Sequence, residues 1–308
     1  MNKIRKFEGL VAAPFTPMHP DGSLNLDLVP AYHAFLAKNG LVGAFIGGSS
    51  GEGPSLTRDE RRRLVERWAA CGKADGRLRL IALVGGTSYG ECIENAVFCR
   101  GLGLAAIAVV APYYFKPADA AALADFVSKV GAAVPDLPLY FYHIPALSGV
   151  SLPMIDFLGR IADRLPSFAG IKFTHVDFMD FLSCLLFRQG AYDMLWGYDE
   201  TLLPALAAGA RGAIGSTYNY AAPLYQALMK AFDAGDLARA RELQRKSIDL
   251  IRLLGKYGGI AVGKAYMRLI GLDCGPFRSP VTNMDEAAFA RFREDVDALD
   301  MAEWFSKP

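Results

Sequence analysis

A lysine stands in the middle of an apolar stretch, AGIKFTH, at residues 169–175. An ammonium group is almost never fully buried unless something compensates its charge. If the stretch is a strand, Ala169, Ile171 and Phe173 lie on one face and Lys172 lies on the other. Because Ile171 and Phe173 are bulky enough to pack against covering helices, Lys172 is predicted to point the opposite way.

Lys172 and Thr174 would then project together from the carboxyl end of the strand. A desolvated lysine has a lowered pKa and becomes a nucleophilic amine, which forms Schiff bases with carbonyl substrates. A buried ion pair, or an amine that reaches solvent at the strand end, is the alternative that the local sequence leaves open. The other eleven lysines lie in polar or helical surroundings and compete poorly with Lys172.

The stretch YFYHIPALSG, residues 140–149, carries a candidate proton relay. Tyr140 and Tyr142 share a strand face, and Tyr142 is nearer the carboxyl end. A phenol there can exchange protons with a substrate hydroxyl, whereas aromatic packing is the alternative. His143 falls on the other face, where we expect a structural role.

The turn GGSSGEG, residues 47–53, offers hydroxyl and backbone N–H groups. Ser49 and Ser50 suit a carboxylate-binding cradle, and Glu52 is expected to brace the turn. Its first five residues also match GxSxG, the nucleophile elbow. That motif needs a helix directly after the serine, but here the helix signal is delayed to a capping box at Thr57.

Two further motifs end apolar runs with polar groups. GYDE supplies Asp199 and Glu200, and GSTYN supplies Ser216. Their carboxylate and hydroxyl groups suit a polyhydroxylated substrate, whereas helix capping by Asp199 is the alternative reading. No group of His, Asp and Glu residues has the spacing of a metal site.

These residues all follow short apolar runs that alternate with amphipathic ones. The strand candidates are residues 9–16, 43–48, 79–86, 105–114, 138–145, 168–174, 194–199 and 211–219. The helix candidates between them are residues 57–73, 89–101, 119–133, 151–165 and 199–210. Such alternation predicts a parallel sheet with right-handed crossovers, and eight units favour a closed (β/α)8 TIM barrel over a doubly wound open sheet.

We expect the catalytic barrel to occupy residues 1–235. Residues 236–308 are predicted to form a C-terminal helical extension packed on the barrel, because no strand candidate remains there. In such barrels, chemistry takes place at the carboxyl ends of the strands, where the polar motifs lie.

Composition excludes several classes of partner. The 308 residues carry a formal net charge of +1, and basic residues do not interleave with aromatic ones, so we expect no nucleic-acid partner. The amino-terminal segment lacks a sustained apolar run, and the longest apolar run is too short to span a bilayer, so we expect no membrane partner. Five cysteines without a CxxC pair favour reduced thiols and a cytoplasmic location.

Five motifs, GGSSGE, YHIPALSG, GIKFT, GYDE and GSTYN, occur in this order. The chain thereby resembles the class I pyruvate aldolases of the dihydrodipicolinate synthase and N-acetylneuraminate lyase superfamily over nearly its whole length. It is most similar to the lyase branch, for which YHIPAL(S/T)G with GSTYN is quite specific. The hydroxyl pair, often Ser-Thr or Thr-Thr in the family, is Ser-Ser here. The resemblance implies a (β/α)8 barrel that usually assembles as a homotetramer.

The resemblance also implies residue roles. Lys172 would form the Schiff base, Tyr142 would relay protons, and Tyr114 would reach into a neighbouring subunit's site to support the relay. Ser49 and Ser50 would hold the pyruvate carboxylate. The rest of the pocket would be Gly215 at the pyruvate and Thr174, Gly197, Asp199, Glu200 and Ser216 at the hydroxylated tail of a sugar acid.

The activity implied by the resemblance is the reversible aldol cleavage of N-acetylneuraminate to pyruvate and N-acetyl-D-mannosamine, with no metal or organic cofactor. The synthase branch usually carries an arginine where Leu147 stands, and an aliphatic side chain cannot make that bidentate contact. A dihydrodipicolinate synthase-like condensation is therefore disfavoured. An aldolase or dehydratase for another 2-keto-3-deoxy sugar acid, and a non-catalytic binding member of the fold, remain alternatives.

Overall fold

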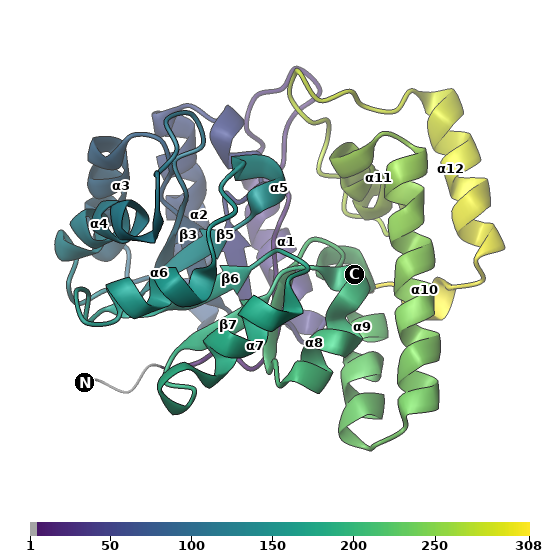
Figure 1. The fold of residues 1–308 in the computed structure, drawn as a ribbon. Helices are drawn as coiled ribbons and strands as arrows, with labels where there is room; N and C mark the ends of the chain where they lie inside the picture. Colours follow the sequence, from purple (N-terminus) through teal and green to yellow (C-terminus); the bar gives the residue numbers. More distant parts are fainter. Residues whose placement is uncertain (1–4) are drawn as a thin grey trace.

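Eight parallel strands close into a barrel in the computed structural model, which describes residues 5–308 (Figure 1). Each strand pairs with the next along the chain, and β8 pairs with β1 to complete the ring. The strands are β1 (Gly9–Ala12), β2 (Gly43–Ile46), β3 (Arg79–Leu83), β4 (Ala106–Val110), β5 (Leu139–His143), β6 (Phe168–Phe173), β7 (Asp193–Trp196) and β8 (Gly212–Gly215). Each strand overlaps a predicted apolar run. Because the ring of strands is closed, the predicted TIM barrel is confirmed and the doubly wound open sheet is excluded.

Helices surround the ring. Five were predicted individually: α2 (Arg58–Asp75), α3 (Tyr89–Gly101), α4 (Ala120–Ala132), α6 (Met154–Ile161) and α8 (Leu202–Ala208). Three others escaped individual recognition: α1 (Val29–Lys38), α5 (Pro145–Ser148) and α7 (Phe178–Leu186). The capping box at Thr57 is confirmed, because its side chain accepts from the Glu60 N–H while the Glu60 carboxylate accepts from the Thr57 N–H.

Short 3-10 turns link several of these elements. They are η1 (Leu26–Leu28), η2 (Gly53–Ser55), η3 (Phe187–Gln189), η4 (Asp199–Thr201), η5 (Gly259–Ala261) and η6 (Ala302–Trp304). None of the helices between residues 5 and 308 is both long enough and apolar enough to cross a bilayer.

The chain after β8 is helical, as predicted. It forms α9 (Tyr218–Asp233), α10 (Leu237–Lys256), α11 (Val262–Leu269) and α12 (Glu286–Ala298). In Figure 1, α10, α11 and α12 stand together on the side of the barrel away from α3 and α4. The hydroxyls of Tyr225 on α9 and Ser247 on α10 lie 3.0 Å apart, in a buried contact between these two helices.

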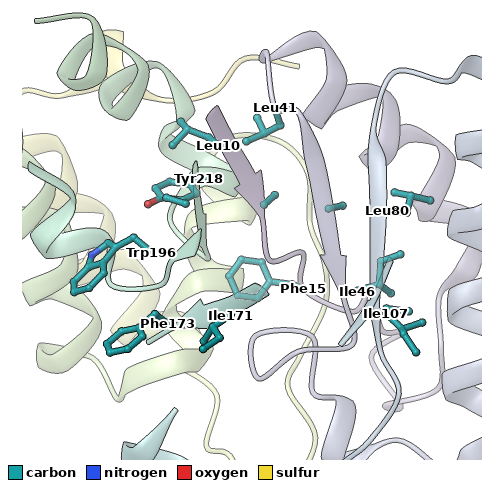
Figure 2. Packing of buried hydrophobic residues seen from close by; sticks show 14 of the residues in the cluster. Leu10, Phe15, Leu41, Ile46, Leu80, Ile107, Ile171, Phe173, Trp196 and Tyr218 are labelled. Atoms are coloured by element: carbon teal, nitrogen blue, oxygen red, sulfur yellow. The ribbon is translucent and has the colours of Figure 1, made fainter. Parts of the chain in front are cut away.

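Apolar side chains form two separate clusters, one inside the ring and one between the ring and its helices. The inner cluster includes Phe45 and Leu195. The outer cluster includes Ile171, Phe173 and Trp196, and Figure 2 shows Phe173 beside Trp196. Those two rings stack with their centres 6.1 Å apart. Ile171 and Phe173 therefore pack under the helices, as predicted.

The prediction for Ala169 is wrong, because this residue belongs to the inner cluster rather than lying with Ile171 and Phe173. The pairing of β5 with β6 explains the difference. Leu139 is opposite Phe168, but the next residue, Tyr140, is already opposite Gly170. One residue of β6 is thus extra, and such a bulge breaks the alternation of faces. The regular alternation resumes before Lys172.

Candidate active site

Lys172 and Tyr142 are neighbours on adjacent strands at the carboxyl end of the barrel. They are opposite each other in the register of β5 and β6. The Lys172 amine lies 4.2 Å from the centre of the Tyr142 ring and 4.4 Å from that of the Phe45 ring on β2. Phe45 and Tyr142 both belong to the inner cluster. Lys172 therefore projects into the barrel, as the alternation of β6 predicts.

The Lys172 amine is an unpaired base in an apolar setting. The residue is only 4 % exposed, and among residues 5–308 no carboxylate lies within ion-pair distance of it. Desolvation lowers the pKa of Lys172 to about 7, while the negative charge of Asp199 partly opposes the shift. Both alternatives, a buried ion pair and an amine that reaches solvent, are thus wrong. A substantial fraction of the amine is neutral near pH 7.

The Tyr142 phenol points at the serine turn. Its oxygen lies 3.4 Å from Oγ of Ser49. Burial raises the pKa of Tyr142 to about 12, although Ser49 and the nearby Thr174 hydroxyl act in the opposite direction. The phenol is therefore protonated at neutral pH. His143 turns away from this site and is buried among Phe141, Phe173 and His175, in agreement with a structural role.

Ser49 and Ser50 lie half-buried in the turn between β2 and η2. The turn is closed by the Glu52 N–H, which donates to the Ser49 carbonyl at 3.1 Å. It is also tightly folded, since a Cβ on Gly53 would overlap the Gly47 carbonyl. No α-helix follows the serines directly, because α2 begins only at Arg58. The nucleophile elbow is thus excluded by geometry.

Asp199 is held from a neighbouring strand end. Its Oδ2 accepts from the backbone N–H of Thr217 at 3.0 Å and from the Thr217 hydroxyl at 2.6 Å. The alternative that Asp199 caps its own helix is wrong, because η4 begins with Asp199 and shows no capping side chain. Burial raises the pKa of Asp199, and the Thr217 bonds oppose that shift.

Two buried polar atoms at the barrel mouth, Oδ1 of Asp199 and Oγ1 of Thr174, have no hydrogen bond of ordinary geometry within the part of the chain that the structure describes. The Tyr218 hydroxyl faces the Asp199 carboxylate, and the Tyr142 hydroxyl faces Thr174. A Cβ on Gly215 would overlap the Asp199 carboxylate, and one on Gly197 would overlap the Thr174 hydroxyl. The two glycines therefore make room for these polar groups. Since buried polar atoms are normally satisfied, the pair is suited to meeting the hydroxyls of a ligand.

Glu200 and Ser216 complete the polar rim. Both are half-buried, and burial raises the pKa of Glu200. The Ser216 carbonyl accepts from the Asn219 amide at 2.7 Å, and that amide also donates to the Ala13 carbonyl at 2.9 Å. Asn219, the last residue of GSTYN, thus ties the end of β8 to the end of β1.

Two residues discussed in the sequence analysis do not join the group of site residues around Lys172 in the single chain. Tyr114 lies between β4 and α4 and is 78 % exposed, with its ring against that of Phe115. Leu147 lies on α5 and is also exposed.

Sequence reasoning missed two buried residues of the C-terminal extension that contact the site's turns. Lys264 on α11 is one of the lysines that the sequence places in polar or helical surroundings. Its amine is nevertheless buried and pairs with Glu52 at 2.8 Å. Gln244 on α10 donates to the Asp199 carbonyl at 3.2 Å. A polar residue on an apolar helix face was the only available signal, and it does not reveal the partner.

No metal site accompanies these residues. Between residues 5 and 308, no three His, Cys, Asp or Glu side chains gather as metal ligands would. A cavity of about 270 Å³ beside the serine turn is lined by Gly47, Gly53, Arg61, Glu91 and others, but by neither Lys172 nor Tyr142. Its two charged side chains already pair with each other at 3.2 Å. The candidate site is therefore placed by the chemistry at Lys172.

Comparisons with known proteins agree with this geometry. The model of the dihydrodipicolinate synthetase family matches residues 6–299. N-acetylneuraminate lyase from Gallus gallus is 38 % identical over 304 residues, which cover 97 % of this chain and 98 % of the relative.

Solved structures give the same picture. An N-acetylneuraminate lyase from Proteus mirabilis superposes with a TM-score of 0.93 at 36 % identity, covering 96 % of this chain and 99 % of that one. A dihydrodipicolinate synthase from Aquifex aeolicus superposes with a TM-score of 0.87 at 26 % identity, covering 96 % and 98 %. Both branches share the fold, and the lyase is the more similar of these two in sequence.

Proposed function

The chain belongs to the dihydrodipicolinate synthetase family, and we propose that it is a Schiff-base aldolase that reversibly cleaves N-acetylneuraminate to pyruvate and N-acetyl-D-mannosamine. The observation that carries the proposal is the Lys172 amine, which is buried, unpaired by any carboxylate among residues 5–308, and has its pKa lowered to about 7. The similarity to lyases supports the choice of substrate.

The reaction begins at the Lys172 amine. Its neutral form attacks the C2 carbonyl carbon of the open-chain keto acid, and water leaves to give an imine. The protonated imine draws electrons from the C3–C4 bond. Because the lysine itself supplies the electron sink, the proposed mechanism needs no metal or organic cofactor.

Tyr142 handles the proton of the C4 hydroxyl. Because burial raises the pKa of this phenol to about 12, it does not act as a free phenolate at neutral pH. It accepts the C4 proton while passing its own proton to the substrate carboxylate. The C3–C4 bond then breaks, the aldehyde leaves, and an enamine of pyruvate remains. Protonation at C3 and hydrolysis release pyruvate and restore the lysine.

The remaining residues bind the two ends of the substrate. Ser49 and Ser50 hold the carboxylate, and Gly215 lines the pyruvate end. The sugar tail contacts Oγ1 of Thr174 and Oδ1 of Asp199, described above. The other residues that we assign to the tail are Gly197, Glu200 and Ser216.

We propose a homotetramer as the active form. Tyr114 is far too exposed to act within its own chain, but it is suited to completing a neighbour's site. Met179, Leu182 and Leu186 lie three and four residues apart on α7, and all three are exposed. Such an apolar stripe on one helix face is typical of an interface.

The proposal also covers the domain organisation of the chain and its location in the cell. We assign residues up to 235 to the catalytic barrel, which the structure describes from residue 5 onward, and residues 236–308 to the extension packed on it. The five cysteines, all within the described residues, form no disulfide, which agrees with a reducing cytoplasm. A role in the breakdown of sialic acid, a carbohydrate, follows from the proposed substrate.

The test is the release of pyruvate from N-acetylneuraminate, followed with a coupled assay. We expect pyruvate and N-acetyl-D-mannosamine in equal amounts. A panel of other 2-keto-3-deoxy sugar acids serves as the comparison. If pyruvate is released from one of those acids and not from N-acetylneuraminate, the proposed substrate is wrong while the Schiff-base chemistry stands.

A further inference from the structure

The serine turn adopts a conformation that its own residues do not favour. Glu52 has a φ of 55°, in the left-handed region that non-glycine residues rarely enter. Such a residue persists only where its surroundings hold it. From the barrel itself, the Thr16 hydroxyl donates to the Gly51 carbonyl at 2.5 Å.

The Glu52 side chain is held from the C-terminal extension. Its Oε1 pairs with the Lys264 amine on α11 at 2.8 Å, across 212 residues of sequence. Both side chains are only 3 % exposed. Its Oε2 accepts from the Arg278 N–H at 2.8 Å, so both carboxylate oxygens of Glu52 are engaged by the extension.

Lys264 is in turn fixed in place. Its amine also donates to the Pro276 carbonyl at 2.7 Å, and it lies 4.6 Å from the centre of the Phe277 ring. The helix that carries it packs closely on the barrel, since a Cβ on Gly263 would overlap the Phe15 ring. The ion pair thus joins a rigid helix to the turn that carries Ser49 and Ser50.

Stability alone does not account for this arrangement. A buried ion pair loses much of its Coulombic gain to desolvation, and apolar replacements of similar volume are often as stable or more so. In some proteins, such a pair instead specifies one conformation of the chain. The conformation specified here is that of the turn proposed to receive the substrate carboxylate.

We propose that Lys264 is a positioning residue for this turn, acting through Glu52 to aim the Ser49 and Ser50 groups at the substrate carboxylate. The inference rests on the proposed function, because it assumes that a keto-acid carboxylate binds at the serines. It adds a residue of the C-terminal extension, outside the barrel, to the determinants of substrate affinity.

The test measures carboxylate binding separately from chemistry and folding in the full-length protein. Borohydride traps the imine of pyruvate on Lys172 over a range of pyruvate concentrations. For Lys264→Met we expect the half-trapping concentration and the KM for N-acetylneuraminate to rise about tenfold, the effect of one lost hydrogen bond. Trapping at saturating pyruvate stays complete, and kcat changes far less than KM.

Two further variants separate positioning from folding. Lys256→Met removes an exposed lysine of the same extension, which pairs with Asp295 at 2.6 Å, and we expect no change in half-trapping concentration. The double variant Glu52→Gln with Lys264→Met contains no unpaired buried charge. We expect its melting temperature to recover while its KM stays raised.

The outcomes that overturn the inference are distinct. If Lys264→Met traps at the wild-type pyruvate concentration, or the double variant regains both melting temperature and KM, the pair serves stability alone. If the wild-type protein itself gives no adduct on Lys172, the proposed function fails and this inference falls with it.

Discussion

At the scale of single residues, the lowered pKa of Lys172 comes from apolar walls rather than from a neighbouring cation. Desolvation is the dominant cause of its lowered pKa, and the aromatic rings of Phe45 and Tyr142 provide the walls. The Asp199 carboxylate limits the shift. A neutral amine and a protonated phenol therefore lie side by side at neutral pH, as imine chemistry with proton relay requires.

The pH dependence of the reaction follows from the pKa of about 7 at Lys172. The neutral amine is the nucleophile, and its fraction rises as pH rises through that pKa. We expect kcat/KM for N-acetylneuraminate cleavage to rise with pH through a midpoint near 7 and to level off above it. Initial rates between pH 5 and pH 9 check this. An inflection near 10, the ordinary lysine pKa, would show that the amine is hydrated.

Tyr142→Phe tests the relay. Removing the phenol should lower kcat about 10²- to 10⁴-fold, the usual contribution of a proton-transfer group, with little change in KM. The fold should be intact, because the hydrogen bond that the phenol makes within residues 5–308 is a long one, of 3.4 Å to Ser49. Steady-state kinetics and a melting curve measure both effects.

Tyr140→Phe is the matched control. Its hydroxyl lies on the same strand but donates to Asp193 at 2.8 Å, in a buried contact away from Lys172. We expect a loss of about 1–3 kcal/mol in unfolding free energy and nearly unchanged kcat. A similar loss of kcat in both variants would show that losing any buried hydroxyl of β5 disturbs the site, and would contradict a relay specific to Tyr142.

At the scale of elements, the periodicity of apolar residues predicts which face of a strand a side chain lies on. It fails where that face depends on how the strand pairs with its neighbour. The alternation of β6 correctly placed Lys172 inside the barrel and Phe173 under the helices. It misplaced Ala169, because the bulge depends on register with β5, which one strand's sequence does not encode. Helix capping by Asp199 is similarly consistent with the local sequence. The local sequence does not reveal its actual partner, Thr217, because that residue lies eighteen positions away.

Gln244→Leu tests how α10 supports the tail pocket. The Gln244 amide accepts from the Leu203 N–H at 2.8 Å and donates to the Asp199 carbonyl at 3.2 Å. Losing both should cost about 1–3 kcal/mol of unfolding free energy, because buried groups are left unpaired. The KM for N-acetylneuraminate should rise several-fold while pyruvate trapping is unchanged. Urea denaturation and steady-state kinetics provide these values.

Gln226→Leu is the control for that variant. Gln226 on α9 donates to the Asn39 carbonyl at 2.8 Å, at the end of α1, and makes no hydrogen bond to η4 among the described residues. The Gln226→Leu variant should lose unfolding free energy without a change in the KM for N-acetylneuraminate. Equal effects of both variants on KM would mean that α10 does not act on the tail pocket specifically.

At the scale of the whole molecule, the C-terminal extension holds turns at two different strand ends. Lys264 engages the turn after β2, and Gln244 engages the turn after β7. The sequence predicted that the extension is helical and packs on the barrel. It could not predict these contacts, because they join residues as many as 212 positions apart through buried polar groups.

Met179→Glu tests the proposed assembly. Met179 is 79 % exposed in the apolar stripe of α7, so a charge there should weaken the interface without harming the fold. We expect a smaller species by light scattering and lower activity, because Tyr114 then lacks a neighbour. Val97→Glu, at a 51 % exposed position on α3, is the control and should leave the assembly intact. A monomeric wild-type protein would contradict the proposal.

The most direct measurement of the central claim is reductive trapping of the substrate on the enzyme. The protein is treated with N-acetylneuraminate and borohydride, digested, and analysed by mass spectrometry, with Lys172→Met as the control. We expect a reduced pyruvyl adduct on the peptide that contains Lys172, and none in the variant. An adduct on another lysine such as Lys264, or no adduct at all, would contradict it.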